Sequence, residues 1–176
     1  TEIYTLEFVG RSDVYKRQPA FTAVANPTIN SYKRLVPGYE APTYIAWATD
    51  NRTPLVRIPA GRGKVARLEL RSGDPSANPY IFIAAILAAG ADGIENELVA
   101  PEPVERNIYK MNAAERDEAQ ITELPGSLDQ AIANLEKDDI LVNALGNTFV
   151  DFFVNSKKSE LLAYKTNVTN WEHNKY

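Results

Sequence analysis

Four arginines and one glutamate lie close together in the first half of the chain. The segment KVARLELR alternates apolar and charged residues, so a β-strand here would place Arg67, Glu69 and Arg71 on the face opposite its leucines. Arg52 and Arg57 precede this segment, and clustered guanidinium groups repel one another unless an anion neutralises them. Their planar forks suit phosphate and carboxylate. The pattern therefore predicts a binding site for one of these anions.

The same charges allow two other interpretations. A solvent-facing strand whose arginines and glutamate pair with one another would show the same alternation. A cluster with a single carboxylate could also hold a hard cation, because Mg²⁺ commonly takes one or two carboxylates together with substrate phosphates. A P-loop is excluded as the phosphate-binding device, since the chain has no Gly-x-x-x-x-Gly-Lys-[Ser/Thr] sequence.

The overall charge argues against a nucleic-acid partner and supports a local anion site. The chain carries a net charge of −4, but the stretch from Ser31 to Arg71 carries +5. Cysteine is absent, which excludes disulfides and thiolate metal sites. No apolar run approaches the roughly 18 residues of a membrane span, so we expect no membrane partner. The absence of cysteine fits a cytoplasmic protein.

The elements that would position these charges predict an α+β fold. Residues 1–18 show neither helical nor strand periodicity and resemble translated adaptor sequence, so we expect native sequence to begin near Pro19. Prolines and asparagines in 19–42 predict turns and loops. Strands are expected at 43–50, 55–59 and 64–71. Four helices are expected. The first begins at Asn78 and is buried on all sides, and the second lies near 128–137 and is capped by Ser127. A short third helix ends at Gly146, and the last runs from 147 to about 164.

Several long motifs resemble type I glutamine synthetases in order and spacing. They are NPTINSYKRLVPGYEAP (26–42), NRTPLVRIP (51–59), RLELRSGDPSANPY (67–80), AAGADGIENEL (88–98) and PGSLDQAIANLEKD. The resemblance covers about residues 19–176. It implies the C-terminal part of the family's catalytic domain, an antiparallel sheet or half-barrel with packed helices, truncated at the N-terminus.

The resemblance also implies an activity. Type I glutamine synthetases are cytoplasmic ligases that join ammonia to glutamate through γ-glutamyl phosphate, with ATP as co-substrate and Mg²⁺ or Mn²⁺ as the cation. They assemble as dodecamers of two hexameric rings. The family's N-terminal domain and its other metal ligands would lie upstream of the motifs found here. We therefore expect this chain to be inactive alone and Tyr44, Trp47 and Phe82 to lose part of their cover.

Residue by residue, the resemblance assigns two catalytic and two glutamate-binding positions. Glu40 in PGYEAP matches the glutamate that closes the site and helps to deprotonate ammonium. Arg52 in NRTP matches the arginine that stabilises the transferring phosphoryl group. Arg34 in SYKRL and Arg71 in LELR match the arginines that hold the carboxylate of glutamate.

Further positions match nucleotide and metal contacts. Arg52, Arg57, Lys64 and Arg67 fall where the family contacts ATP phosphates, and Glu69 matches a metal ligand. Tyr109 lies where some bacterial relatives carry an adenylylated tyrosine, but the residues after it fit the unmodified branch, so we expect a structural role.

Two alternatives share most of this pattern. A ligase that joins glutamate to an amine other than ammonia would have the same fold and phosphoryl chemistry. A non-catalytic descendant with a structural or regulatory role would have no need of all the charged residues that match the family.

Overall fold

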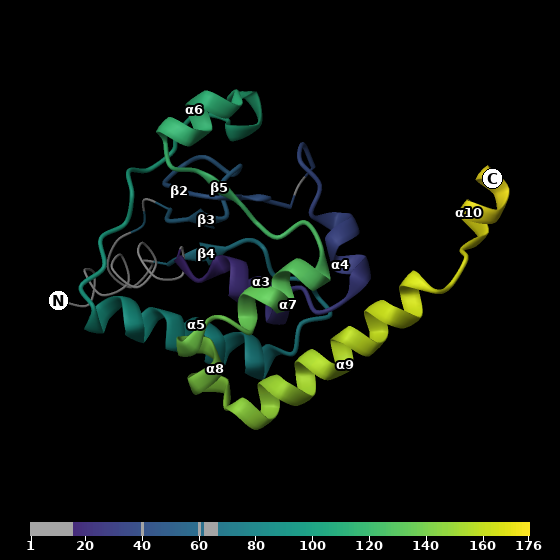
Figure 1. Ribbon diagram of the computed structural model, residues 1–176. Coiled ribbons are helices and arrows are strands. Elements are labelled where there is room, and N and C mark those ends of the chain that lie inside the picture. The colour runs from purple at the N-terminus through teal and green to yellow at the C-terminus, as the bar shows by residue number, and fades with distance from the viewer. Residues whose placement is uncertain (1–15, 40, 60, 62–66) are drawn as a thin grey trace.

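The computed structural model describes residues 16–39, 41–59, 61 and 67–176 as helices packed beside two small sheets (Figure 1). The helices are α3 (Gln18–Ala25), α4 (Ile29–Arg34), α5 (Pro79–Glu95), the 3₁₀ turn Ile108–Lys110, α6 (Ala113–Glu118), α7 (Leu128–Leu135), α8 (Asp139–Leu145), α9 (Asn147–Lys165) and α10 (Asn170–Lys175). The strands are β1 (Tyr44–Ile45), β2 (Trp47–Ala48), β3 (Val56–Arg57), β4 (Glu69–Leu70) and β5 (Thr122–Glu123). The mixed α+β class is confirmed.

Helix α3 lies at the centre of the helical layer and packs against α7 and α5. The prediction of turns throughout 19–42 is wrong here and in α4. Every residue from Ala20 to Ala25 is buried, and small side chains let the helix approach its neighbours on all sides. A helix buried all round has no polar face to reveal its period, and Pro19 is tolerated because it lies in the first turn.

Helix α4 is short and begins at a capping box. The Thr28 side chain accepts a hydrogen bond from the amide of Ser31, and the Ser31 side chain accepts one from the amide of Thr28. This cap sets the start of the helix that carries Arg34.

Strands β1 to β4 are shorter than predicted but lie within the predicted segments, whereas β5 was not predicted. Strands β1 and β5 form one antiparallel pair, and β2, β3 and β4 form a three-stranded sheet in that order. The expected antiparallel pairing holds for β3 and β4, which align Arg57 with Glu69, whereas β2 and β3 are parallel. Tyr44 and Trp47 are buried rather than exposed, because segments 101–111 and 121–124 pack against these strands.

Helix α5 begins as predicted but is not buried on all sides. The Asn78 side chain accepts hydrogen bonds from the amides of the first turn, and Pro79 is the first helical residue. Ala85 and Ala89 face the core, whereas Tyr80 is 83% and Leu87 66% exposed. The face of this apolar helix that carries Tyr80 and Leu87 is therefore exposed.

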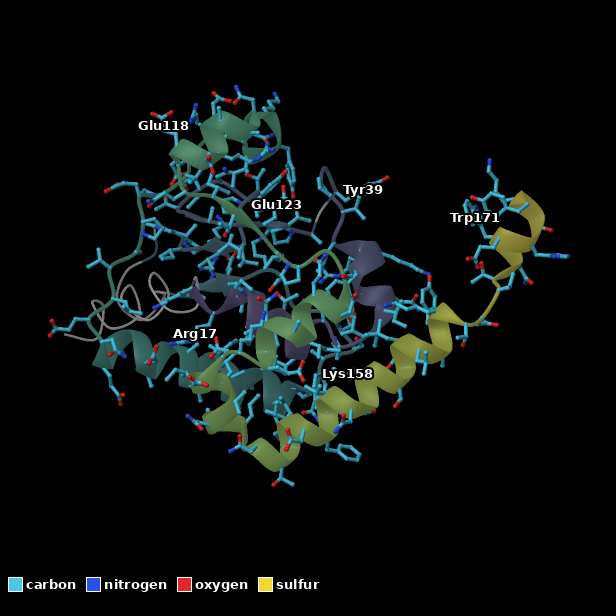
Figure 2. All side chains as sticks on the ribbon, viewed as in Figure 1. Arg17, Tyr39, Glu118, Glu123, Lys158 and Trp171 are labelled. Atoms are coloured by element: carbon cyan, nitrogen blue, oxygen red, sulfur yellow. The ribbon has the colours of Figure 1, made fainter. Side chains whose placement is uncertain are left out.

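The C-terminal helices follow the predicted order. Ser127 precedes α7 but its side chain makes no cap bond, and the amide of Gly126 donates to Gln130 instead. Gly146 separates α8 from α9 with a positive φ of 86°. Figure 1 shows α9 running along the base of the molecule and α10 standing away from it, with Trp171 on that outlying helix in Figure 2. No described helix is long and apolar enough to cross a membrane.

Candidate functional site

The β3–β4 pair brings three of the predicted charged residues together. Arg57 Nη1 donates to both carboxylate oxygens of Glu69, at 3.2 and 3.0 Å, and Arg67 Nε donates to Glu69 Oε1 at 3.2 Å. Leu68 and Leu70 pack against the core beside β3, so the predicted alternation is confirmed. The charged side of this sheet holds two guanidinium groups around one carboxylate.

The electrostatics of Glu69 follow from these contacts. Hydrogen bonds and charge from Arg57, and more weakly from Arg67, lower the pKa of Glu69 below its ordinary value, although partial burial opposes the change. Glu69 therefore stays ionised at neutral pH and neutralises one of the two cations. The pair of arginines keeps an excess positive charge that suits an anionic group.

Arg71 connects this cluster to the turn before β3. Its Nη1 donates to the carbonyl oxygens of Arg52 and Pro54, and its backbone amide donates to Leu55 O at 3.0 Å. The Arg52 side chain is exposed, and its guanidinium makes no hydrogen bond or ion pair with the described residues. Arg52 can therefore reach a ligand without breaking an existing contact within this part of the chain.

Arg34 reaches the same region from α4. Its Nη2 donates to Ser72 O at 2.6 Å and to Asn26 Oδ1 at 2.9 Å, and its Nε lies 3.6 Å from Asp74 Oδ2. The side-chain amide nitrogen of Asn26 and the hydroxyl of Ser72 are buried without a hydrogen-bond partner among the described residues. Two polar atoms next to the arginine are thus left unsatisfied.

Asp74 stays charged beside Arg34. Burial tends to raise the pKa of Asp74, but hydrogen bonds from Ser76 and Ser31 and the charge of Arg34 outweigh it and hold the pKa below the ordinary value. We did not predict roles for Asp74 or Asn26 from the sequence. Both lie in the motifs RSGDP and NPT, so their position in those motifs was the available signal.

The segment 67–74 joins all six predicted site residues that the structure describes. Arg67, Glu69 and Arg71 belong to it, and Arg57 is joined through Glu69. Arg52 is joined through its carbonyl to Arg71, and Arg34 through Ser72. The structure therefore brings these residues into one continuous set of contacts around β4. Glu40 and Lys64 lie outside the described residues.

The described residues do not form a complete cation site. They contain no group of three or more histidine, cysteine, aspartate or glutamate side chains that could hold a metal ion. Glu69 is a single carboxylate, and both its oxygens already accept hydrogen bonds from arginine. A divalent cation at this position needs further ligands.

Tyr109 is half-buried and packs against a small hydrophobic cluster. Its hydroxyl donates to Ala41 O at 3.3 Å, and its ring meets that of Tyr44 edge-on at a centroid distance of 5.6 Å. These contacts fit the predicted structural role. Tyr39, which precedes Glu40 in the sequence, projects from the loop after α4 in Figure 2, and its side chain is exposed.

Comparison with known proteins identifies similar sequences and folds. The family profile described as glutamine synthetase, catalytic domain, matches residues 10–176. Glutamine synthetase of Thermotoga maritima is 53% identical over 169 residues, which cover 96% of this chain and 38% of that protein. Glutamine synthetase of Staphylococcus epidermidis is 54% identical over 163 residues, which cover 93% of this chain and 36% of that protein. The chain therefore spans a little over a third of the length of these curated relatives.

Solved structures agree with these matches. A complex of GmaS with ADP superposes with a TM-score of 0.83 at 36% identity, covering 97% of this chain and 39% of that one. GmaS without ligand gives a TM-score of 0.80 at 37% identity, covering 97% and 38%. The agreement extends over nearly the whole chain.

Proposed function

The chain belongs to the glutamine synthetase catalytic-domain family, and on this basis we propose that the protein containing it joins ammonia to glutamate at the expense of ATP. The observation that supports this most is the set of arginines assembled around segment 67–74. Phosphoryl transfer depends mainly on positioning and on neutralising phosphate charge, which guanidinium groups supply.

In this proposal, two arginines hold glutamate. Arg34 and Arg71 bind its carboxylate. The contacts of Arg34 to Ser72 and Asn26 fix that guanidinium before substrate arrives. Preorganisation of this kind lowers the entropic cost of binding.

Four positive side chains act on the nucleotide. Arg57, Lys64 and Arg67 bind the phosphates of ATP. Arg52 contacts the γ-phosphoryl group as it moves to the side-chain carboxylate of glutamate, forming γ-glutamyl phosphate and ADP. The superposition on GmaS with ADP bound supports an adenine nucleotide as the ligand.

Glu40 acts in the second step. Its carboxylate attracts ammonium and accepts one proton from it. The resulting ammonia attacks the acyl carbon of γ-glutamyl phosphate, and the C–O bond to phosphate breaks. Glutamine and inorganic phosphate are released after loss of a second proton to solvent.

Mg²⁺ or Mn²⁺ would neutralise phosphate charge in this reaction. Within this chain we assign it a single ligand, Glu69, and the remaining ligands belong to sequence outside the chain, as expected from the fraction of the relatives that it spans. We propose that the intact protein is a cytoplasmic dodecamer and that this chain is inactive by itself. Residues 1–18 remain a predicted non-native segment. Within them, Arg17 pairs with Asp92 and Asp138, and α3 begins at Gln18.

The test is an assay of the full-length protein recovered from the source locus. We expect phosphate release from ATP that depends on both glutamate and ammonium, and a lower rate when a primary amine replaces ammonium. Arg52→Lys should reduce kcat by about 100-fold and leave KM for glutamate within about twofold, because one stabilising group is displaced in the transition state. The control is Lys137→Ala, which changes an exposed lysine far from Arg52 in the sequence and should keep full activity.

The outcomes separate the candidate functions. Preference for a primary amine over ammonium would identify the alternative ligase. Absence of any glutamate-dependent phosphate release from a folded full-length protein would refute the proposal and favour a non-catalytic role.

A further inference from the structure

The exposed carboxylate of Glu105 accepts hydrogen bonds from several backbone amides of the turn that precedes β3. Glu105 Oε1 accepts hydrogen bonds from the amide of Thr49 at 2.8 Å and from its hydroxyl at 2.7 Å. Glu105 Oε2 accepts from the amides of Asp50 and Asn51, each at 3.4 Å. Three successive N–H groups and a hydroxyl therefore converge on a single side chain that lies more than fifty residues further along the chain.

Further contacts fasten the same turn to the same segment. Asn51 Nδ2 donates to Val104 O at 3.1 Å and to Arg106 O at 2.6 Å, on either side of Glu105. Asn51 Oδ1 accepts from the amide and hydroxyl of Thr53, at 2.9 and 3.0 Å. The turn and segment 104–106 are thus joined from both directions.

The segment itself is held against the sheet. The amide of Val104 donates to Trp47 O at 2.8 Å, and Trp47 Nε1 donates to Pro101 O at 2.7 Å. The amide of Ile108 donates to Thr53 Oγ1 at 3.3 Å, and Ile108 is fully buried. Glu105 is therefore carried on a backbone that cannot shift without disturbing β2 and the core beneath it.

We call the contacts that join residues 49–51 to residues 104–106 the Glu105 clamp. Arg52 directly follows the clamped residues in the sequence. Its side chain is exposed and its guanidinium makes no hydrogen bond or ion pair with the described residues, so no such interaction within this part of the chain fixes its position. The direction in which it projects is set by the backbone of residues 49–53. That backbone is held by Glu105 on one side and by Arg71, through the Arg52 carbonyl, on the other.

We propose that Glu105 is a positioning residue, which aims Arg52 at the transferring phosphoryl group by holding the turn at residues 49–51. The inference rests on the proposed function for the role of Arg52, whereas the clamp itself rests on the contacts alone. A displacement of about 1 Å in a group that contacts the transition state can cost about 100-fold in rate. Glu105 therefore affects catalysis without touching substrate.

The test compares Glu105→Gln with Glu102→Gln, a change of the same kind at a neighbouring exposed glutamate whose side chain makes no hydrogen bond or ion pair with the described residues. Glu105→Gln keeps the size of the side chain but removes its charge and one acceptor oxygen. Hydrogen exchange of individual amides in this chain is measured first. We expect the Thr49 amide to exchange about fivefold faster or more in Glu105→Gln, and at the wild-type rate in Glu102→Gln. Unchanged exchange at Thr49 in Glu105→Gln would overturn the proposal.

Kinetics of the full-length protein then test the link to Arg52. Glu105→Gln should lower kcat about tenfold or more and leave KM for glutamate within about twofold. In an Arg52→Ala background the same change should have no further effect on kcat, because its effect passes through Arg52. An equal kcat loss in both backgrounds, or a normal kcat despite faster amide exchange, would refute the positioning role. A wild-type protein without ligase activity would refute the proposed function instead, and the exchange result would still decide the clamp.

Discussion

The contact between Arg57 and Glu69 allows us to predict the coupling free energy of this ion pair. We consider a double-mutant cycle with Arg57→Gln and Glu69→Gln, each of which removes one charge and keeps a polar side chain. A second double-mutant cycle combines Arg67→Gln with Glu69→Gln, because Arg67 contacts the same carboxylate as Arg57. The two arginines differ mainly in exposure, so the two cycles test whether burial decides the strength of the pair.

The geometry gives the expected magnitudes. Arg57 donates two hydrogen bonds to Glu69, at 3.2 and 3.0 Å, and the two side chains are 17% and 31% exposed. A charge-assisted pair in this setting lies between an exposed ion pair and a buried one, so we expect a coupling free energy of about 1.5 kcal/mol. The Arg67 side chain is 57% exposed, and its coupling to Glu69 should stay below about 0.5 kcal/mol.

The assay is urea unfolding of this chain, followed by circular dichroism at pH 7 and at low pH. Because the pKa of Glu69 is lowered in the folded state, its stabilising effect is complete above the ordinary value of 4.5 and is lost as the pH falls through the lowered value. The Arg57 coupling should therefore disappear once the pH falls below the lowered pKa of Glu69. Equal couplings for the two arginines, or an Arg57 coupling that persists in acid, would refute the reasoning.

Two further predictions concern the framework that carries the site. Leu135→Ala should lower the free energy of unfolding by about 3 kcal/mol, because this side chain is fully buried, whereas Leu162→Ala, at a 65% exposed position, should change it by less than about 0.5 kcal/mol in the same urea titration. Gly146→Ala should cost about 2 kcal/mol, since φ is +86° there and alanine is strained in that conformation; calorimetry should show a lower Tm than for Gly126→Ala, and equal Tm values would contradict this account.

The sequence predicted local features of the charged segment better than the packing around it. Alternation in LELR identified which residues share a face, because a strand with one apolar side has an unambiguous period of two. The Asn78–Pro79 signal located the start of α5 for a similar reason, since an N-cap acts locally. Features that depend only on neighbouring residues of the same segment could therefore be predicted from the sequence.

Features that depend on contacts between distant segments could not be predicted from the sequence. Helix α3 was missed because its residues are buried on all sides and carry no polar face. The cover over one side of α5 was overestimated, because an apolar sequence gives no information on whether a partner is present. The clamp at Glu105 joins positions more than fifty residues apart, and no local pattern marks it.

The arrangement of contacts also explains how separate motifs can act as one site. Segment 67–74 carries Arg67, Glu69 and Arg71, and reaches Arg34 through Ser72 and the turn at Arg52 through Arg71. The same segment leads directly into α5, which begins at Pro79 and presents the exposed side chains of Tyr80 and Leu87. Burial of about 100 Å² of apolar surface contributes roughly 2.5 kcal/mol. Any element that covers α5 therefore restrains the helix whose first turn follows the arginine cluster, and can influence that cluster without touching it.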